Sequence, residues 1–547
     1  MPEPSSLRGS SSLASCLLVF AVTTTLFAVL PDRLEAQALY YRSIPIGERA
    51  IGLGGAFTGV ASDPSATYYN PAGVMRGGRF ELLGSFSSIV FTRKKLVDAF
   101  DSPQVDTTFT TKRTSTLPRF IGTVVKFGRK KFGDHQFALG FSTLEVARDD
   151  LGEGFTENNP DISLDLRVNS NYRSRWYGIS FGAQVTEKSA VGFTIFLSDQ
   201  GSRYNEDIGI ATGGAFNDGL RVGGDSATTS ISNNVQAWHF VPRLGWIHRI
   251  NSLWEVGLMF QTPGIPLSQK GDVLRRDTTD ISPDESTFFL FDADDLKAKM
   301  PIPFELRAGF GFQVRPETLL SFDAAVAGPV KDKSVFAGVD VGLGAYFPPS
   351  TARRWVPNFA IGAEHKFGNI VVAGGFLTNF SAAPDVPETS NVYVPDQVNM
   401  WGGSVSVGVD MKGYRFTVGA TGQYGKGDAL AVTFDNNAEV VSYRRTDATR
   451  SLLAFYIAGA VSVASRSAKD VKERRKRKKQ EENGEEVEDS NADADADTGA
   501  DADTGAGTDA GADAGTDPGT DPGTDPDTGT DTGTDAGADT GADTGAD

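Results

Sequence analysis

The chain has very few cysteine and histidine residues, the side chains that bind metals through sulfur or through an aromatic nitrogen. Its 547 residues include one cysteine and four histidines. Cys16 falls in the N-terminal 38 residues, interpreted below as a cleaved signal peptide, so disulfides, thiol catalysis and thiolate metal sites are excluded together for the mature chain. The histidines lack the i, i+3 or i+4 spacing of a metal site on one helix face; they are His135, His239, His248 and His365. The sequence predicts no metal and no other cofactor.

The N-terminal apolar run is too short for a membrane-spanning helix. It covers Leu17–Leu30, contains three threonines and stops at Pro31, whereas a spanning helix needs about 20 residues. With Arg8 ahead of it and Ala36-Gln37-Ala38 behind it, the run is typical of a secretory signal peptide. We predict a signal peptide over residues 1–38, cleaved after Ala38.

The C-terminal segment lacks basic residues. Gln480–Asp547 contains 17 Asp and 5 Glu with no Lys or Arg, a charge of −22 against −18 for the whole chain, which leaves +4 for the preceding residues. Lys472–Lys479, just before it, holds seven basic residues in eight. Such a composition cannot bury enough apolar surface to fold. We therefore predict a disordered tail over residues 466–547, basic at first and then acidic, which lies in the periplasm.

From Phe80 to Ser465 the sequence lacks a sustained helical period and instead alternates with a period of two, which indicates strands. In Tyr414–Tyr424, apolar side chains at even positions alternate with polar ones at odd positions. Fourteen such segments start near residues 80, 117, 136, 166, 190, 234, 254, 302, 318, 358, 370, 398, 414 and 451.

The connections between these segments alternate strictly between two classes. Six are short turns, at residues 128–135, 186–189, 250–253, 315–317, 368–369 and 411–413. Seven are long polar loops, at residues 93–116, 149–165, 199–230, 272–297, 327–357, 381–397 and 425–449. This is the pattern of fourteen up-and-down strands whose two ends both lie on the short-turn side.

The polar face of the strands distinguishes a membrane barrel from a soluble β-sandwich. It carries Glu305, Arg307, Glu364, Asp410 and Arg415, too much charge for a filled core. Segments of about ten residues suit a tilted strand through hydrocarbon, and a barrel in lipid must close because unpaired backbone groups cannot face lipid. We predict an all-β fold: a 14-stranded antiparallel transmembrane β-barrel over residues 80–465, in the outer membrane.

The segment between the signal peptide and the first strand, residues 39–79, has the chemistry of a plug. A fourteen-strand barrel leaves an open lumen, and the stretch LGGAFTGVASDPSATYYNPAG at 53–73 is small, apolar and glycine-rich. Asp63 and Asn70 can each cap a helix that begins at the following proline, Pro64 or Pro71. Glycines and alanines there allow close packing against a wall.

The same stretch resembles the N-terminal hatch of the outer-membrane long-chain fatty-acid transporter family, the FadL-like proteins, which also include aromatic-hydrocarbon transporters and PorV-like barrels. The matching residues are Gly54, Gly55, Asp63, Pro64, Asn70, Pro71 and Ala72. The resemblance implies that this hatch plugs the barrel and that Asn70, Pro71 and Ala72 shift when ligand passes. It also implies passive transport of long-chain fatty acids or other hydrophobic compounds. The alternative is a PorV-like scaffold for protein secretion or docking; a pore without a hydrophobic ligand is a third.

Two groups of residues are candidates for ligand contact. Phe288, Phe289, Leu290 and Phe291 lie in a predicted long loop between acidic residues, and exposed apolar patches mark binding sites; the alternative is a loop core packed against Phe216 or Tyr346. Three lumen cations could hold an anionic head group or form ordinary ion pairs with Glu305, Asp410 and Glu364. They are Arg307, Lys366 and Arg415.

An enzymatic function has one weak signal. Residues 178–182 spell the nucleophile pattern G-x-S-x-G, which works only at a strand–turn–helix elbow. Here it lies inside an alternating strand, so we predict that the protein is not an enzyme. The expected partners are a hydrophobic small molecule and outer-membrane lipid, with no nucleic acid.

Overall fold

The computed structural model describes residues 40–98, 108–117, 120–128, 136–158, 162–212, 215–217, 220–222, 225–281, 285–331, 335–336, 351–390, 394–411, 413–434 and 441–463. They all belong to one unit, Met1–Ser467. The predicted signal peptide and tail lie outside these residues.

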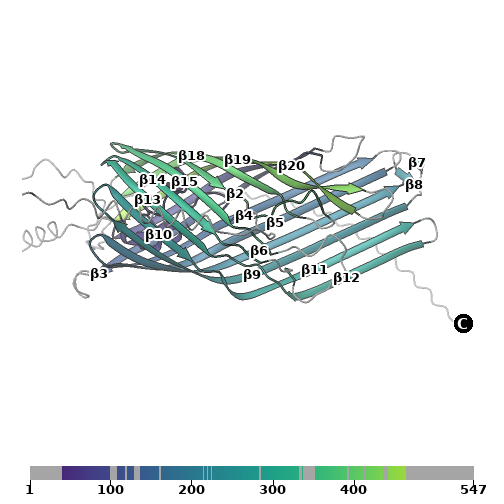
Figure 1. Ribbon diagram of the computed structural model, residues 1–547, viewed down its shortest axis with the longest axis horizontal. Coiled ribbons are helices and arrows are strands. Elements are labelled where there is room, and N and C mark those ends of the chain that lie inside the picture. Colours follow the sequence, from purple (N-terminus) through teal and green to yellow (C-terminus); the bar gives the residue numbers. More distant parts are fainter. Residues whose placement is uncertain are drawn as a thin grey trace, which may run out of the picture. The chain divides into compact units, whose positions relative to one another are not determined.

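The described chain begins with short helices and continues as strands (Figure 1). The helices are α2 (Glu48–Gly52), α3 (Ala66–Tyr69) and the 3₁₀ helix η1 (Pro71–Met75). The strands of the first half are β1 (Phe80–Leu96), β2 (Phe109–Leu117), β3 (Phe120–Gly128), β4 (Gln136–Asn158), β5 (Ile162–Gln184), β6 (Ser189–Thr212), β7 (Ala215–Asn217), β8 (Leu220–Val222) and β9 (Asp225–Arg249). Those of the second half are β10 (Trp254–Gln261), β11 (Ile265–Ile281), β12 (Glu285–Lys297), β13 (Glu305–Arg315), β14 (Thr318–Ala327), β15 (Val356–Phe367), β16 (Ile370–Asn379), β17 (Thr389–Ser390), β18 (Gln397–Met411), β19 (Tyr414–Phe434) and β20 (Val441–Val463).

The strands form a closed antiparallel barrel with fourteen positions, as predicted. β1 closes the ring by pairing with β20 from Phe80↔Val463 to Leu96↔Ala448. Three of the positions are each occupied by two strands in succession. The first position holds β2 and β3, which both pair with β1. The second holds β10 and β11, which both pair with β9, and the third holds β12, which pairs with β11, and β13, which pairs with β10. Pro263 interrupts the second of these positions, and Pro301 and Pro303 the third. Proline has no N–H to give to a ladder, so strands break there.

The side chains are sorted between the two faces of the wall as the alternation predicted. On β18, Val405 is 64% exposed on the outside and its neighbour Ser404 is 4% exposed toward the lumen. Large apolar side chains are exposed around the outer surface, among them Phe193, Ile361, Phe376, Phe416 and Phe455. An apolar surface of this extent is typical of a barrel whose outside faces lipid. Among the described residues, no helix has the length and apolar character to cross a bilayer.

The strands are longer than the sequence predicted at the end with the long connections, here called the loop end. β11 and β12 enclose most of the predicted loop 272–297, and β6 and β9 enter the predicted loop 199–230 from both sides. Figure 1 shows β11 and β12 running well past β13, β14 and β15. The prediction of loops there was wrong because hydrogen bonding between neighbouring strands continues in water, where the outward face no longer needs to be apolar.

Candidate functional site

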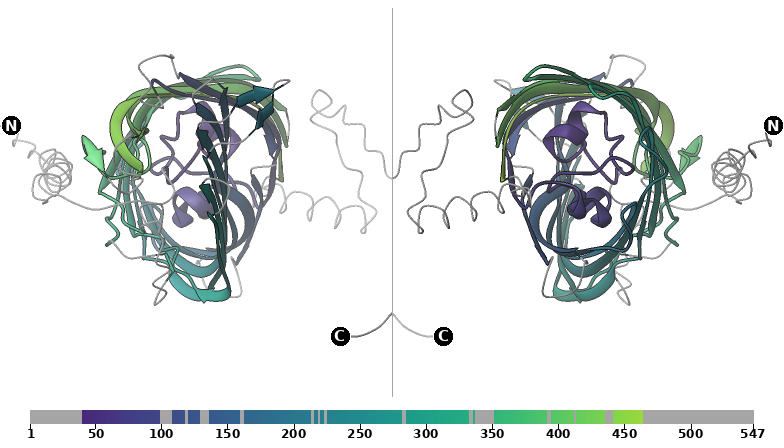
Figure 2. Two further views of the ribbon diagram at one scale, coloured as in Figure 1. Left: turned by 90° about the vertical axis from the view of Figure 1, so that its right-hand side faces the viewer. Right: turned by 90° about the vertical axis from the view of Figure 1, so that its left-hand side faces the viewer.

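The interior of the barrel is occupied by residues 40–79, here called the lumen segment. Both end-on views show it enclosed by the ring of strands (Figure 2). Its aromatic side chains are buried: Phe57, Tyr68 and Tyr69 are at most 1% exposed. They pack edge to face, with ring centroids 5.5 Å apart for Phe57–Tyr69 and 5.3 Å for Tyr68–Tyr69. The segment is therefore a packed core inside the lumen.

Inward-facing glycines let the main chain of the lumen segment touch the wall. A Cβ at Gly192 of β6 would lie 2.5 Å from the carbonyl carbon of Pro71, and one at Gly362 of β15 would lie 2.6 Å from the carbonyl oxygen of Leu53. Real Cβ atoms do not approach other atoms so closely. Further wall glycines that meet the main chain of the segment are Gly245, Gly257, Gly309 and Gly375, whereas Gly182 and Gly311 meet its side chains. These positions follow the outline of the segment.

Gly54 and Gly55 have a different reason to be glycine. Their φ angles are 65° and 88°, in the left-handed region that other residues adopt only at a cost. They form the turn that follows α2. A side chain at Gly54 would also meet the backbone of Gly375 and Phe376 at 3.0 Å.

The Asn70 side chain makes hydrogen bonds both within the lumen segment and to the barrel wall. Its Oδ1 accepts a hydrogen bond from the amide of Ala72 at 3.2 Å, which caps η1, and Pro71 takes the first helical position. Its Nδ2 donates to the carbonyl oxygens of Thr58 and of Trp246 on β9, both at 3.0 Å. Asn70 is fully buried, so all three of these bonds form away from water.

Asp63 also accepts hydrogen bonds at the start of a turn. Its Oδ1 accepts from the amide and hydroxyl of Ser65, at 2.8 and 2.6 Å. The helix itself, α3, begins one residue after Ser65. Burial raises the pKa of Asp63, which the two bonds from Ser65 partly offset.

Two guanidiniums of the lumen segment form ion pairs with the wall near the end with the short turns, here called the turn end. Arg49 makes a two-point contact with Glu364 of β15, at 2.7 and 2.9 Å. Arg76 contacts Glu255 of β10 at 2.5 Å. The segment is thus held to two wall strands, β15 and β10, which lie three positions apart in the ring. Both contacts are charge-assisted hydrogen bonds, which are the stronger kind.

A buried charge cluster of the wall lies against the two tyrosines. Arg243 of β9 and Arg307 of β13 are each 1% exposed and share the carboxylate of Glu305, at 3.3 and 2.6 Å. The Arg243 guanidinium lies 4.0 Å from the centre of the Tyr68 ring and donates to the Tyr68 carbonyl. Arg307 lies 5.4 Å from the centre of the Tyr69 ring. The cluster is paired internally and also recognises the segment through cation–π contacts.

The three predicted lumen cations are all engaged in ion pairs. Lys366 and Arg415 both contact Asp410, at 3.0 and 3.1 Å, and Arg307 pairs with Glu305. Arg415 also lies 4.0 Å from Glu48 of α2. Glu364, which the sequence suggested as a partner within the wall, pairs with Arg49 instead. Of the two predicted explanations, a site for an anionic head group and ordinary ion pairs, the second therefore describes these residues.

Glu48 is buried where α2 meets the wall. It is 1% exposed, and its Oε2 has no hydrogen-bond partner. Burial raises the pKa of Glu48 to about 7, against the opposing effect of Arg415. The lumen segment thus presents to strand β19 a carboxyl group that binds and releases its proton near neutral pH.

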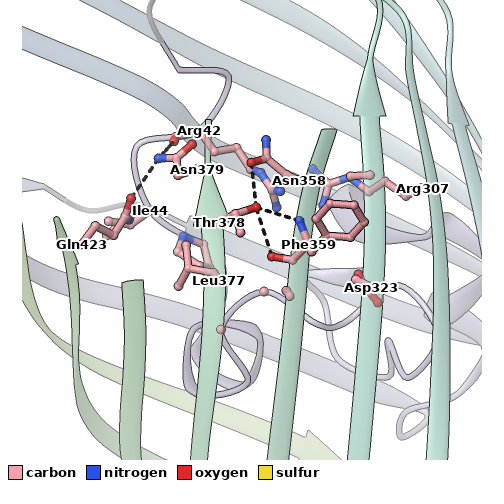
Figure 3. Close-up of a pocket in the computed structure, with 15 residues that line it drawn as sticks. Arg42, Ile44, Arg307, Asp323, Asn358, Phe359, Leu377, Thr378, Asn379 and Gln423 are labelled. Carbon is pink, nitrogen blue, oxygen red and sulfur yellow. Dashed lines mark hydrogen bonds between the residues drawn. The ribbon is translucent and has the colours of Figure 1, made fainter. Parts of the chain in front are cut away.

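Two small cavities lie on the loop-end side of the lumen segment. One of about 30 Å³ lies beside Arg42, Asn358, Asn379 and Gln423, and Figure 3 shows its polar side chains directed toward one another. Asn379 donates to the Arg42 carbonyl at 3.0 Å and to the Gln423 amide oxygen at 2.9 Å. A second cavity, of about 40 Å³, lies beside Tyr40 and Arg450. Each accommodates water but not an organic molecule.

Phe288–Phe291 form part of strand β12 and not a loop, which corrects the prediction for this segment. They pair with Arg275, Arg276, Asp277 and Thr278 of β11. Phe291 packs against a buried cluster that includes Val235 and Val273. Because faces alternate along a strand, Phe289 shares that inner face, whereas Phe288 and Leu290 face outward. The suggested packing against Phe216 or Tyr346 falls on side chains outside those described.

Several contact residues escaped the sequence analysis, including Arg243, Glu255, Asp323 and Arg76. The inward positions of β9 and β14 would have identified Arg243 and Asp323 as lumen residues by alternation. Ser180 of the G-x-S-x-G pattern lies within β5 and bonds Thr194 at 2.6 Å, with no helix after it. The described residues contain no group of three or more His, Cys, Asp or Glu that could hold a metal.

No family model and no curated protein matches the chain. Solved structures do match. A FadL homologue of Pseudomonas aeruginosa aligns with 78% of this chain and 100% of its own at 12% identity and a TM-score of 0.50. The deltaS2 mutant of the monoaromatic hydrocarbon channel TodX aligns with 76% and 98% at 16% identity and a TM-score of 0.52. The resemblance read from residues 53–73 is confirmed at the level of the fold.

Proposed function

We propose that the protein carries hydrophobic small molecules passively across the outer membrane, and that the lumen segment acts as the hatch. The single observation that carries this proposal is the filled lumen. Residues 40–79 touch the wall on many strands, and the two cavities of about 30 and 40 Å³ described on the loop-end side are each too small for an organic molecule. Passage therefore requires the segment to move.

Long-chain fatty acids and neutral hydrocarbons are the two ligand classes within this proposal. The similar structures are described as a FadL homologue and as a monoaromatic hydrocarbon channel, so both classes suit the fold. The lumen cations are paired with carboxylates, which supports a route that does not depend on a charged head group. No observation among the described residues favours the scaffold alternative.

A disulfide between hatch and wall tests the proposal. The chain after residue 38 has no cysteine, and a Cβ at Gly52 would lie 3.2 Å from the Cβ of Ala373 on β16. Disulfides join Cβ atoms about 3.5–4.5 Å apart. The Gly52→Cys/Ala373→Cys pair can therefore close once the Ser406 hydroxyl, 2.3 Å from the Gly52 Cβ, rotates away.

The measurement is uptake of labelled oleate and of labelled toluene into proteoliposomes. We expect uptake by the unmodified protein above that of empty liposomes, loss of uptake in the oxidised double variant, and recovery on reduction. The two single variants are the controls. Uptake that persists in fully cross-linked protein would show that the hatch need not move.

A further inference from the structure

A larger cavity lies at the turn end of the barrel, beneath the lumen segment. It measures about 380 Å³, within the range of small-molecule sites. We call it the lower vestibule. Arg49, Arg76, Lys188, Arg249, Glu187 and Glu255 supply its charged lining. A second cavity of about 310 Å³, which shares Arg249 and Glu255 and also includes Ser252, adjoins it.

The charges of the lower vestibule do not balance. Glu255 is shared by two guanidiniums, from Arg76 at 2.5 Å and from Arg249 at 3.2 Å. Arg49 is neutralised by Glu364. The Lys188 ammonium bonds the carbonyl oxygen of Ile250 at 3.4 Å. Three cations thus face the two carboxylates of the lining, which leaves one positive charge for a monoanion.

The excess of positive charge affects the pKa of Arg76. Burial lowers the pKa of Arg76, and the nearby cations of Arg249 and Arg49 lower it further, against the opposing effect of Glu255. The Arg249 side chain is more than half exposed, so its guanidinium is available to a ligand that enters from the turn end or leaves past the hatch.

The rest of the lining is partly polar, from Ser62, Gln184 and Gln313, and partly apolar. Val60 and Met75 of the lumen segment and Ile247 and Leu319 of the wall supply the apolar part, and all four are buried. An apolar surface beside a cationic rim fits a molecule with a hydrocarbon body and one negative charge. Charge-assisted bonds from guanidinium to carboxylate are short and can be two-pointed.

We propose that the lower vestibule is an exit-side binding site for the carboxylate of an amphipathic organic acid, held by Arg249 and Arg76. This inference rests on the proposed function, since it concerns where a transported molecule pauses after passing the hatch. An acidic peptide also offers carboxylates, but it lacks the hydrocarbon body that Val60, Met75, Ile247 and Leu319 select.

A single-cysteine reporter tests the site in the full-length chain. Ser252→Cys, labelled with a polarity-sensitive fluorophore, is titrated in detergent with decanoate, with decanol and with a synthetic peptide of residues 493–512. We expect decanoate to bind more tightly than decanol. Arg249→Gln should weaken decanoate binding roughly tenfold, the worth of one charge-assisted hydrogen bond, and should leave decanol unchanged.

Arg315→Gln is the matched control, because Arg315 is exposed at the next short turn and does not line the vestibule. Equal binding of decanoate and decanol, or an equal effect of both substitutions, would overturn the inference. A response to the peptide as strong as that to decanoate would overturn it in favour of an acidic peptide. Uptake of neutral toluene without any decanoate preference would contradict this site alone, whereas no uptake of any compound would contradict the proposed function.

Discussion

Asp323 of the barrel wall accepts a hydrogen bond from the backbone amide of Thr58, at 2.8 Å, and so holds the main chain of the lumen segment. The same carboxylate accepts from the amide of Phe57 at 3.1 Å. Both amides and the carboxylate are buried. One wall side chain therefore satisfies two consecutive donors that water cannot reach.

Replacing Asp323 by alanine leaves these two amides without an acceptor. We expect the free energy of unfolding to fall by about 2–6 kcal/mol, since each of the two buried donors left unpaired costs about 1–3 kcal/mol. Urea unfolding in detergent, followed by tryptophan fluorescence, measures the change. Asp323→Asn keeps the volume and one acceptor oxygen and should lose less; equal losses in the two variants would show that the carboxylate charge, not an acceptor oxygen, matters here.

The glycines of β16 provide a matched pair. A Cβ at Gly375 would lie 2.6 Å from the carbonyl oxygen of Leu53 in the lumen segment, whereas one at the adjacent Gly374 would meet only the Ser404 oxygen, at 3.7 Å. We expect Gly375→Ala to destabilise the fold by about 1–3 kcal/mol through overpacking and to expose the lumen segment to limited proteolysis. Gly374→Ala should change neither, and an equal effect of both would contradict the close fit.

Glu48 makes stability depend on pH. Its pKa of about 7 in the folded protein exceeds its ordinary value of 4.5, so between these values the folded state keeps a proton that the unfolded chain has released. Its contribution is fully present below pH 4.5 and is lost as the pH rises through 7, by about 3 kcal/mol in all. Glu48→Gln should remove this part of the pH dependence in urea unfolding between pH 5 and 8. A wild-type slope retained in the variant would place its origin elsewhere.

The outward face of the barrel can be tested at Val405, halfway along the exposed row of β18. Val405→Lys should destabilise the folded barrel in lipid bilayers by about 2–4 kcal/mol, the cost of a lipid-facing cation near the midplane. Equilibrium refolding into vesicles measures it. Lysine at the outward, loop-end position Leu290, which lies beyond the apolar belt, should cost little. Similar costs at the two sites would argue against a lipid-facing surface around Val405.

The two faces of β12 predict different roles in ligand capture. By alternation Phe289 faces inward with Phe291 and is 47% exposed, whereas its neighbour Phe288 faces outward and is 63% exposed. If the inner face collects hydrophobic ligands, Phe289→Ser should lower the initial rate of oleate uptake severalfold, the loss expected for one buried aromatic contact, while Phe288→Ser should not. A loss confined to Phe288→Ser would assign capture to the outer face.

The sequence alone determined the architecture, because a barrel wall in lipid has only two environments and a strand alternates between them at every residue. That regularity was sufficient to count fourteen strands, to place Tyr414 and Phe416 outside, and to place Arg307 and Arg415 inside. The helix cap at Asn70 could also be predicted, since its partner, Ala72, is two residues away along the chain.

Only the tertiary structure decided which residues meet across the lumen. Arg49 pairs with Glu364, Asp323 with Thr58, and Arg76 with Glu255, each across more than 170 positions of sequence. Such pairs depend on the depth at which the lumen segment lies in the barrel, and this depth is set jointly by the packing of Tyr68, Tyr69 and the wall glycines. No local pattern records it, because alternation specifies the face of a side chain but not its partner.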